Sequence, residues 1–187
     1  MEKLFSPWRL RYIRSARRPA SGCVFCAARR ARPGPRSLVL ARGRSNYVIL
    51  NKYPYNNGHL MVVPNAHQAS LVDLDPATLS EMMGLAARCE ATLRRAYRPS
   101  GINLGMNLGR SAGAGIEGHV HLHLVPRWDG DTNFMTVVHG TRVIPEALEE
   151  TWRRLRPLLE RSLAGEPGGR RRAPGGRRPA RRAGSRR

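Results

Sequence analysis

The sequence lacks several features that would place it outside the cell or in a membrane. No stretch approaches the roughly 20 consecutive apolar residues of a membrane-spanning helix. The opening residues 1–9 lack the apolar core of a secretion signal. Only 3 cysteines are present among 187 residues. These absences predict a cytoplasmic protein with no membrane segment, whose reducing surroundings disfavour a disulfide.

Acidic residues are also scarce, because 33 lysines and arginines face only 13 aspartates and glutamates, for a net charge of +20. Residues 167–187 contain nine arginines and no acid, and they have almost nothing to bury. We therefore expect one domain over residues 1–164 and a disordered basic tail over residues 165–187. Such a tail either contacts nucleic acid through its phosphates, without sequence preference, or is a solvated extension.

The most informative segment is His-Val-His-Leu-His at residues 119–123. Alternation with period two is typical of a half-buried β-strand, so a strand over 118–125 is predicted with its three imidazoles on one face. Val120, Leu122 and Leu124 then point into a core. A single half-buried histidine is usually structural, but three in register are not typical of packing. Imidazole is a metal ligand when neutral, and a nucleophile or an acid–base group near neutral pH.

The segment before the histidines favours one of these chemistries. Residues 105–115 are rich in glycine and other small residues, so they can present backbone N–H groups to phosphate oxygens. Because this loop leads directly into the histidine row, phosphoryl or nucleotidyl transfer is favoured. A metal hydrolase that uses all three histidines is the alternative, with a carboxylate from Glu117, Asp129 or Asp131 nearby.

At this point the chain resembles a known family. Residues 119–125 match the histidine-triad (HIT) pattern His-φ-His-φ-His-φ-φ, in which φ is apolar. Residues 51–64, with Gly-His-x-x-Val-x-Pro, are similar to the nucleoside-binding strand pair of that family. Residues 126–134 and residues 4–13 are similar to the branch that contains diadenosine tetraphosphate phosphorylases. The resemblance covers about residues 4–160.

The resemblance implies an enzyme that forms a nucleotidyl-histidine intermediate. His121, the middle histidine, would attack the α-phosphorus of a dinucleoside polyphosphate, and phosphate or water would then resolve the intermediate. His119 and His123 complete the catalytic set. The substrate-binding positions that the resemblance implies are Asn51 at the ribose, His59, Asn107, Ala114 and Gly115 at the phosphates, and Trp128 at the second nucleotide or the acceptor.

One departure from the family pattern bears on the reaction. Many members carry Gly-Gln-x-Val-x-His before the triad, with the glutamine helping the leaving group. Residues 113–119 here read Gly-Ala-Gly-Ile-Glu-Gly-His, with no glutamine and one residue more. This difference argues against a phosphoramidate hydrolase of the usual type. It suits a phosphorylase, in which small residues leave room for inorganic phosphate.

The pair Cys23 and Cys26, separated by two residues, suggests half of a tetrahedral zinc site. Some members of the family combine such a pair with a histidine after the second strand and with the first triad histidine, which here are His67 and His119. We therefore expect a structural zinc on these four residues, with no metal needed for the chemistry. The alternative is that the motif persists without metal, with both thiols packed in the core.

Periodicity and turn signals predict an α+β domain with a five-stranded antiparallel sheet and two main helices. Strands are expected over residues 38–41, 46–51, 59–63, 102–108 and 118–125. Asp75 followed by proline marks the start of a helix over residues 76–96. A second helix is expected over residues 145–163, kinked or restarted at Pro157. The resemblance implies the histidine-triad fold, usually a homodimer.

Besides the metal hydrolase already mentioned, three functions remain open from the sequence. The first is a dinucleoside polyphosphate phosphorylase or hydrolase that acts on diadenosine tetraphosphate with phosphate as acceptor. The second is a nucleoside phosphoramidate or adenylyl hydrolase with the same nucleophile. The third is a non-catalytic nucleotide-binding module, for which the basic tail would serve as an anchor.

Overall fold

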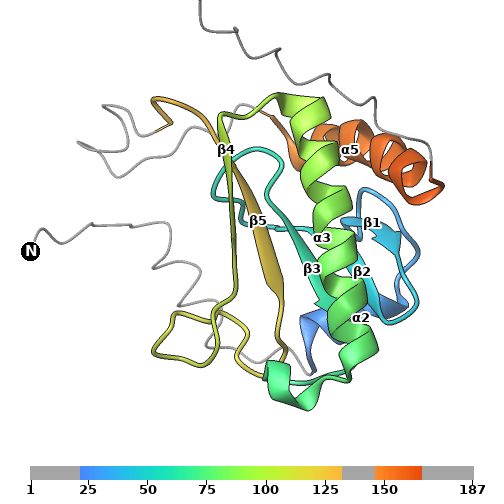
Figure 1. Cartoon of the computed structure of the whole chain (residues 1–187), viewed down its shortest axis with the longest axis vertical. Helices are drawn as coiled ribbons and strands as arrows, with labels where there is room; N and C mark the ends of the chain where they lie inside the picture. Colours follow the sequence, from blue (N-terminus) through green and yellow to red (C-terminus); the bar gives the residue numbers. More distant parts are fainter. Residues whose placement is uncertain (1–21, 132–145, 166–187) are drawn as a thin grey trace, which may run out of the picture.

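One antiparallel sheet of five strands organises the domain. The computed structural model describes residues 22–131 and 146–165 (Figure 1). The strands lie in the order β1-β2-β3-β5-β4, and every neighbouring pair is antiparallel. Their bounds are β1 (Val39–Arg42), β2 (Asn46–Leu50), β3 (Leu60–Pro64), β4 (Gly101–Gly105) and β5 (Leu122–Arg127). The predicted fold class is confirmed.

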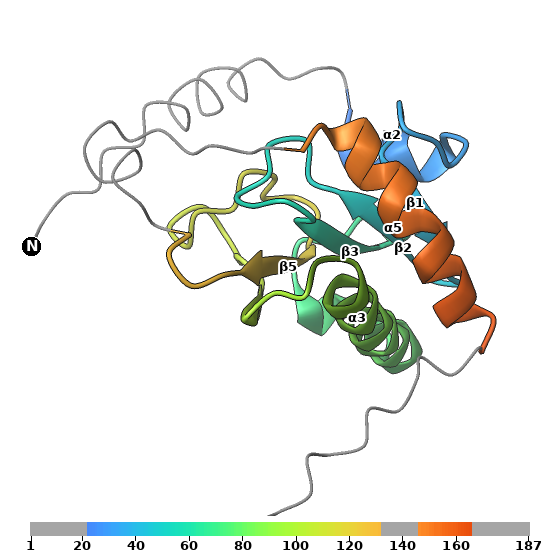
Figure 2. The ribbon, with the colours of Figure 1, turned by 90° about the horizontal axis from the view of Figure 1, so that it is seen from above.

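The two faces of the sheet carry different elements. The long helices α3 (Pro76–Tyr97) and α5 (Leu148–Leu163) pack on one face, where they bury Leu122 and Leu124 in the larger core. A short helix α2 (Val24–Arg30), which the sequence did not predict, packs on the other face through Phe25. Figure 2 shows α2 and α3 on opposite sides of the sheet. A 3₁₀ turn η1 (Leu71–Asp73) precedes α3.

Helix α3 begins and ends close to its predicted bounds, because its capping signals are local. The Asp75 side chain accepts a hydrogen bond from the Thr78 backbone N–H at 2.9 Å. Helix α5 continues through Pro157 without a break, so the predicted restart is wrong. Proline removes one intrahelical hydrogen bond. Leu155 and Leu159, on either side of it, are 0% and 1% exposed and hold the helix against the core.

The last strand begins later than predicted, at Leu122 instead of residue 118. Strand β3 ends at Pro64, which has no N–H to continue a ladder opposite Val120. The Val120 N–H donates instead to the Gln68 carbonyl at 2.7 Å. His119 and His121 therefore lie in the approach to β5, and only His123 lies within the strand.

Several predictions fall outside the described residues. They are the similarity of residues 4–13 and of Asn133 and Phe134 to the phosphorylase branch, and the basic tail from residue 166 onward. The division into a domain over 1–164 and a tail over 165–187 stays a prediction. Within the described ranges, no helix combines the length and the apolar character needed to cross a membrane.

Candidate active site

The three triad imidazoles lie on the face of the sheet opposite α3, as the alternation predicted. Strand pairing places His123 beside Met61, which belongs to the smaller core under α2. The Phe25 ring contacts both other histidines, with centroid distances of 5.4 Å to His119 and 4.8 Å to His121. The His121 and His123 rings are 4.7 Å apart. Alternation along the chain thus gathers the histidines on one side, and α2 covers part of them.

A backbone carbonyl determines the tautomer of His121. Its Nδ1 lies 2.8 Å from the His119 carbonyl oxygen. Because a carbonyl only accepts, Nδ1 carries the proton and Nε2 keeps its lone pair. His121 is 6% exposed, and burial lowers its pKa, although the hydrogen bond to the carbonyl opposes this. The residue is therefore a neutral imidazole with Nε2 available as a nucleophile.

His59 and His123 form a directed hydrogen-bond chain beside His121. The Tyr55 backbone N–H donates to His59 Nδ1 at 3.1 Å, so the His59 proton resides on Nε2. His59 Nε2 lies 2.9 Å from His123 Nδ1 and donates to it. The remaining proton of a neutral His123 is then on Nε2. A lone pair on His121 and an N–H on His123 stand on neighbouring rings, which suits attack at phosphorus and donation to an oxygen.

Burial keeps both members of this chain neutral. It lowers the pKa of His59 to about 3, with further lowering from the neighbouring His123 and His121. It lowers the pKa of His123 to about 4, with a smaller contribution from His121. At neutral pH no imidazolium charge competes with the hydrogen bonds that set the tautomers.

The predicted ribose residue lies next to this chain. Asn51 Nδ2 is 3.5 Å from His59 Nε2, and its Oδ1 accepts from the Tyr53 backbone N–H at 2.9 Å. Its side chain therefore lies at the start of the loop whose Tyr55 N–H contacts His59. Its contact with ribose stays a prediction.

The glycine-rich loop leaves β4 beside the triad, because Gly105 pairs with His123 across the sheet. Asn107 Nδ2 donates to the Gly113 carbonyl at 3.4 Å, and the Ala114 N–H donates to the Gly109 carbonyl at 3.3 Å. Two of the three predicted phosphate donors in the loop, Asn107 and Ala114, are thus engaged within it, and a bound phosphate would have to displace these bonds. The phosphate-binding roles of Asn107, Ala114 and Gly115 stay predictions.

The structure does not bring Trp128 to the histidines. Its ring meets the Tyr97 ring of α3 edge-on, with centroids 6.3 Å apart. Trp128 follows Leu122 and Leu124 in the alternation, and these residues face the larger core under α3. Closeness to the triad in sequence does not place Trp128 on the face of the histidines, because neighbouring positions of an extended chain point to opposite faces. Its predicted contact with a second nucleotide gains no support from this position.

The four predicted metal ligands come together from three separate segments. Their ligand atoms all lie within 4.8 Å of one another. Cys23 Sγ lies 3.3 Å from His119 Nδ1, Cys26 Sγ lies 3.4 Å from His67 Nδ1, and the two Nδ1 atoms are 3.2 Å apart. In a tetrahedron with ordinary zinc distances, neighbouring S–N pairs are about 3.5 Å apart and N–N pairs about 3.3 Å. The residues fit a zinc ion.

The other nitrogen of His119 supports the same interpretation. His119 Nε2 lies 2.9 Å from the Pro64 carbonyl oxygen and donates to it. The lone pair of this fully buried residue is therefore on Nδ1, which faces the two thiols and His67. Hydrogen bonding of the non-ligating nitrogen to a carbonyl is the usual support of a metal-binding histidine.

Two contributors to the site were not recognised in the sequence. Phe25 packs on His121, and the Tyr55 backbone sets the tautomer of His59. The position of Phe25 between the two cysteines was the available signal for the first. Nothing in the sequence indicates a role for the second, because the group involved is a backbone N–H.

With this geometry established, comparison with known proteins identifies the family. The sequence profile described as HIT domain matches residues 35–130. The chain belongs to the HIT domain family. The resemblance inferred from the triad is therefore confirmed.

Relatives of this HIT domain protein include one with a named activity. A Mycobacterium tuberculosis protein named AP-4-A phosphorylase is 39% identical over 175 residues, which cover 89% of this chain and 87% of that protein. The similarity agrees with the branch predicted from the sequence. A zinc-bound histidine triad family protein from Mycobacterium smegmatis has a TM-score of 0.62 at 30% identity, and covers 79% of this chain and 100% of its own.

A third relative extends the comparison beyond the mycobacteria. A hypothetical histidine triad nucleotide-binding protein from Sulfolobus tokodaii superimposes with a TM-score of 0.60 at 26% identity, over 81% of this chain and 100% of its own. The match supports the same fold for this HIT domain protein.

Proposed function

We propose that this HIT domain protein cleaves dinucleoside polyphosphates, with diadenosine tetraphosphate as substrate and inorganic phosphate as acceptor. The observation that carries the proposal is the tautomer of His121, whose Nδ1–H is bound by the His119 carbonyl so that Nε2 is free to attack. The relative named AP-4-A phosphorylase supports the choice of substrate. The small residues before the triad support phosphate as the acceptor.

The reaction proceeds in two displacements. His121 Nε2 attacks the α-phosphorus, the bond from that phosphorus to the bridging oxygen breaks, and ATP departs. Phosphate oxygen then attacks the adenylyl-histidine, the P–N bond breaks, and ADP leaves with the imidazole restored. His123 Nε2–H donates to an oxygen that gains charge during each displacement. Covalent catalysis divides one difficult displacement into two easier ones.

The test is turnover of diadenosine tetraphosphate with and without inorganic phosphate, with separation of the nucleotide products. We expect ADP and ATP, formed only when phosphate is present. AMP and ATP without phosphate would instead establish a hydrolase. No turnover under either condition would contradict the proposal and favour phosphoramidate substrates or a nucleotide-binding module.

We also propose that Cys23, Cys26, His67 and His119 hold a structural zinc. The tetrahedral spacing of their ligand atoms supports this, as does the zinc-bound relative. Zinc would tie α2 to the sheet and hold His119, whose carbonyl orients the nucleophile. No step of the reaction passes through it.

The homodimer implied by the family resemblance is proposed to form along β4. Strand β1, at one edge of the sheet, is engaged by α5, where Trp152 Nε1 donates to the Val39 carbonyl at 2.9 Å. Strand β4, at the other edge, exposes Asn103, Leu104 and Gly105, and Leu104 is 49% exposed. Among the residues that the structure describes, no strand pairs with this edge, and an open edge with an apolar side chain favours pairing with a second copy.

Replacing Leu104 by lysine should therefore weaken self-association, because it places a charge at the pairing edge. Sedimentation analysis of both proteins at micromolar concentration measures this. We expect a dimer for the unaltered protein and a monomer for Leu104→Lys. A monomeric unaltered protein would contradict the proposal.

A further inference from the structure

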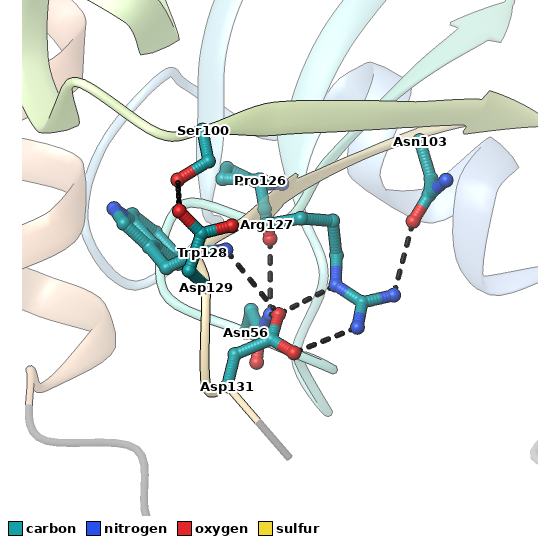
Figure 3. A network of polar contacts seen from close by, with 8 residues as sticks. All are labelled: Asn56, Ser100, Asn103, Pro126, Arg127, Trp128, Asp129 and Asp131. Atoms are coloured by element: carbon teal, nitrogen blue, oxygen red, sulfur yellow. Dashed lines mark hydrogen bonds and ion pairs between the residues drawn. The ribbon is translucent and has the colours of Figure 1, made fainter.

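A polar network lies at the carboxyl end of β5 (Figure 3). Asp131 accepts from Arg127 Nε at 2.5 Å and Nη2 at 2.7 Å, and from Asn56 Nδ2 at 2.8 Å. Its side chain is 13% exposed. The Arg127 hydrogen bonds, with that from Asn56, hold the pKa of Asp131 well below its usual range, against the effect of burial. Asp131 is therefore a carboxylate that only accepts.

Asn56 links this network to the loop before β3. Its Nδ2 also donates to the Pro126 carbonyl at 3.0 Å. Because both partners only accept, the amide nitrogen and not the oxygen must face them. Strands β3 and β5 pair only from Leu124 to Leu122, so the Asn56 side chain attaches the loop to β5 at a point that the ladder does not reach. Figure 3 shows Asn56 between Pro126 and Asp131.

The attached loop carries the group that sets the His59 tautomer. The Asn56 carbonyl accepts from the His59 N–H at 3.1 Å. The preceding residue, Tyr55, donates its N–H to His59 Nδ1 at 3.1 Å, and its ring stacks on His59 with centroids 4.9 Å apart. Asn56 thus anchors the peptide on which both contacts depend. A shift of this loop would move the Tyr55 N–H away from its acceptor.

We propose that Asn56, oriented by Asp131, is a positioning residue for the triad. It holds the loop so that His59 presents Nε2–H to His123, and His123 in turn presents Nε2–H to the substrate. The inference rests on the proposed function for the role of His123, but the tautomers can be measured without substrate. The anchoring pair, Asn56 and Asp131, is separated by 75 residues in the sequence.

The turn at residues 128–131, which carries Asp131, also provides a matched control. Ser100 Oγ donates to Asp129 Oδ2 at 3.2 Å, which fastens the turn to the connection between α3 and β4 but not to the loop around His59 (Figure 3). Ser100→Ala therefore removes a hydrogen bond of the turn without releasing Asn56. A purely structural role of the network would predict similar effects from Ser100→Ala and Asn56→Ala.

The experiment compares Asn56→Ala, Asp131→Asn and Ser100→Ala. Nitrogen-15 shifts of the His59 and His123 rings report the tautomers, and turnover of diadenosine tetraphosphate with phosphate gives kcat and KM. In the unaltered protein and in Ser100→Ala, we expect the shift of an unprotonated Nδ1 on His59. In Asn56→Ala, we expect His59 nitrogen-15 shifts that are averaged over the two tautomers. In Asn56→Ala kcat should fall roughly 10- to 100-fold, with KM changed less than about threefold, since misplacement affects the reacting geometry more than binding.

Asp131→Asn should shift the same spectra in the same direction by a smaller amount, because an amide keeps one acceptor oxygen. If Asn56→Ala does not fold, Asp131→Asn decides the question by the same readouts. Unchanged His59 shifts, with kcat within about twofold of Ser100→Ala, would overturn the proposal. If the unaltered protein does not turn over the substrate, the proposed function fails, and the tautomer spectra alone still decide the positioning role.

Discussion

Replacing His121 by alanine should abolish turnover of diadenosine tetraphosphate. In the proposed reaction, this imidazole supplies the atom that bonds to phosphorus. The neighbouring His123 is held as a donor, with its Nδ1 lone pair occupied by His59. We expect a loss of at least about 10³-fold, which corresponds to about 4 kcal/mol in the barrier. Rates with and without phosphate, at saturating substrate, measure it.

Two further variants, His123→Ala and His121→Gly, separate loss of the proposed nucleophile from general damage. His123→Ala removes a donor but leaves the nucleophile, so its loss should be smaller, roughly 10²-fold. When the reaction is quenched with an alkaline denaturant, in which the P–N bond survives, it should still yield an adenylyl-protein from labelled substrate, whereas His121→Ala should yield none. His121→Gly should regain activity with free imidazole. Retention by His121→Ala of more than about a tenth of the activity, a barrier change under about 1.4 kcal/mol, would show that His121 is not the nucleophile.

Removing the proposed zinc should destabilise the domain strongly. Helix α2 has seven residues, too few to be stable by itself, and its Phe25 is held by the ligands on either side. Cys23→Ser should reduce zinc from about one to below about 0.2 per chain. The loss of several kcal/mol, at about 2–4 °C per kcal/mol for a chain of this size, should lower Tm by roughly 10 °C.

Cys89→Ala is the matched control. Cys89 lies in α3, is buried in the larger core and is not among the four ligands. It should keep the metal. Metal analysis of untagged protein and thermal unfolding before and after chelation measure both effects. Zinc release should also lower kcat, because the His119 carbonyl that orients His121 belongs to the ligand segment. A gently purified protein without zinc, and with an unchanged Tm after chelation, would contradict the metal site.

Local patterns predicted the elements well where the controlling interactions are local. The Asp75 cap and the apolar stripe after it predicted α3, and alternation predicted which side of β5 faces the core. The start of β5 was predicted four residues too early, because it depends on Pro64 opposite Val120 and on the Gln68 carbonyl. Helix α2 was missed because its single buried side chain, Phe25, leaves no periodic pattern.

The sequence by itself determined the family, the set of histidines and cysteines, and the separation of imidazoles from core residues, since these follow from residue types and the period of an extended chain. Tertiary structure alone decided which ring nitrogen of His59, His119 and His121 carries the proton. Those protons are set by the His119, Pro64 and Tyr55 backbone groups. It also placed the Trp128 ring against the Tyr97 ring of α3 and joined Asn56 to Asp131. Backbone donors and acceptors are the same at nearly every position, so only folding reveals which of them a side chain meets.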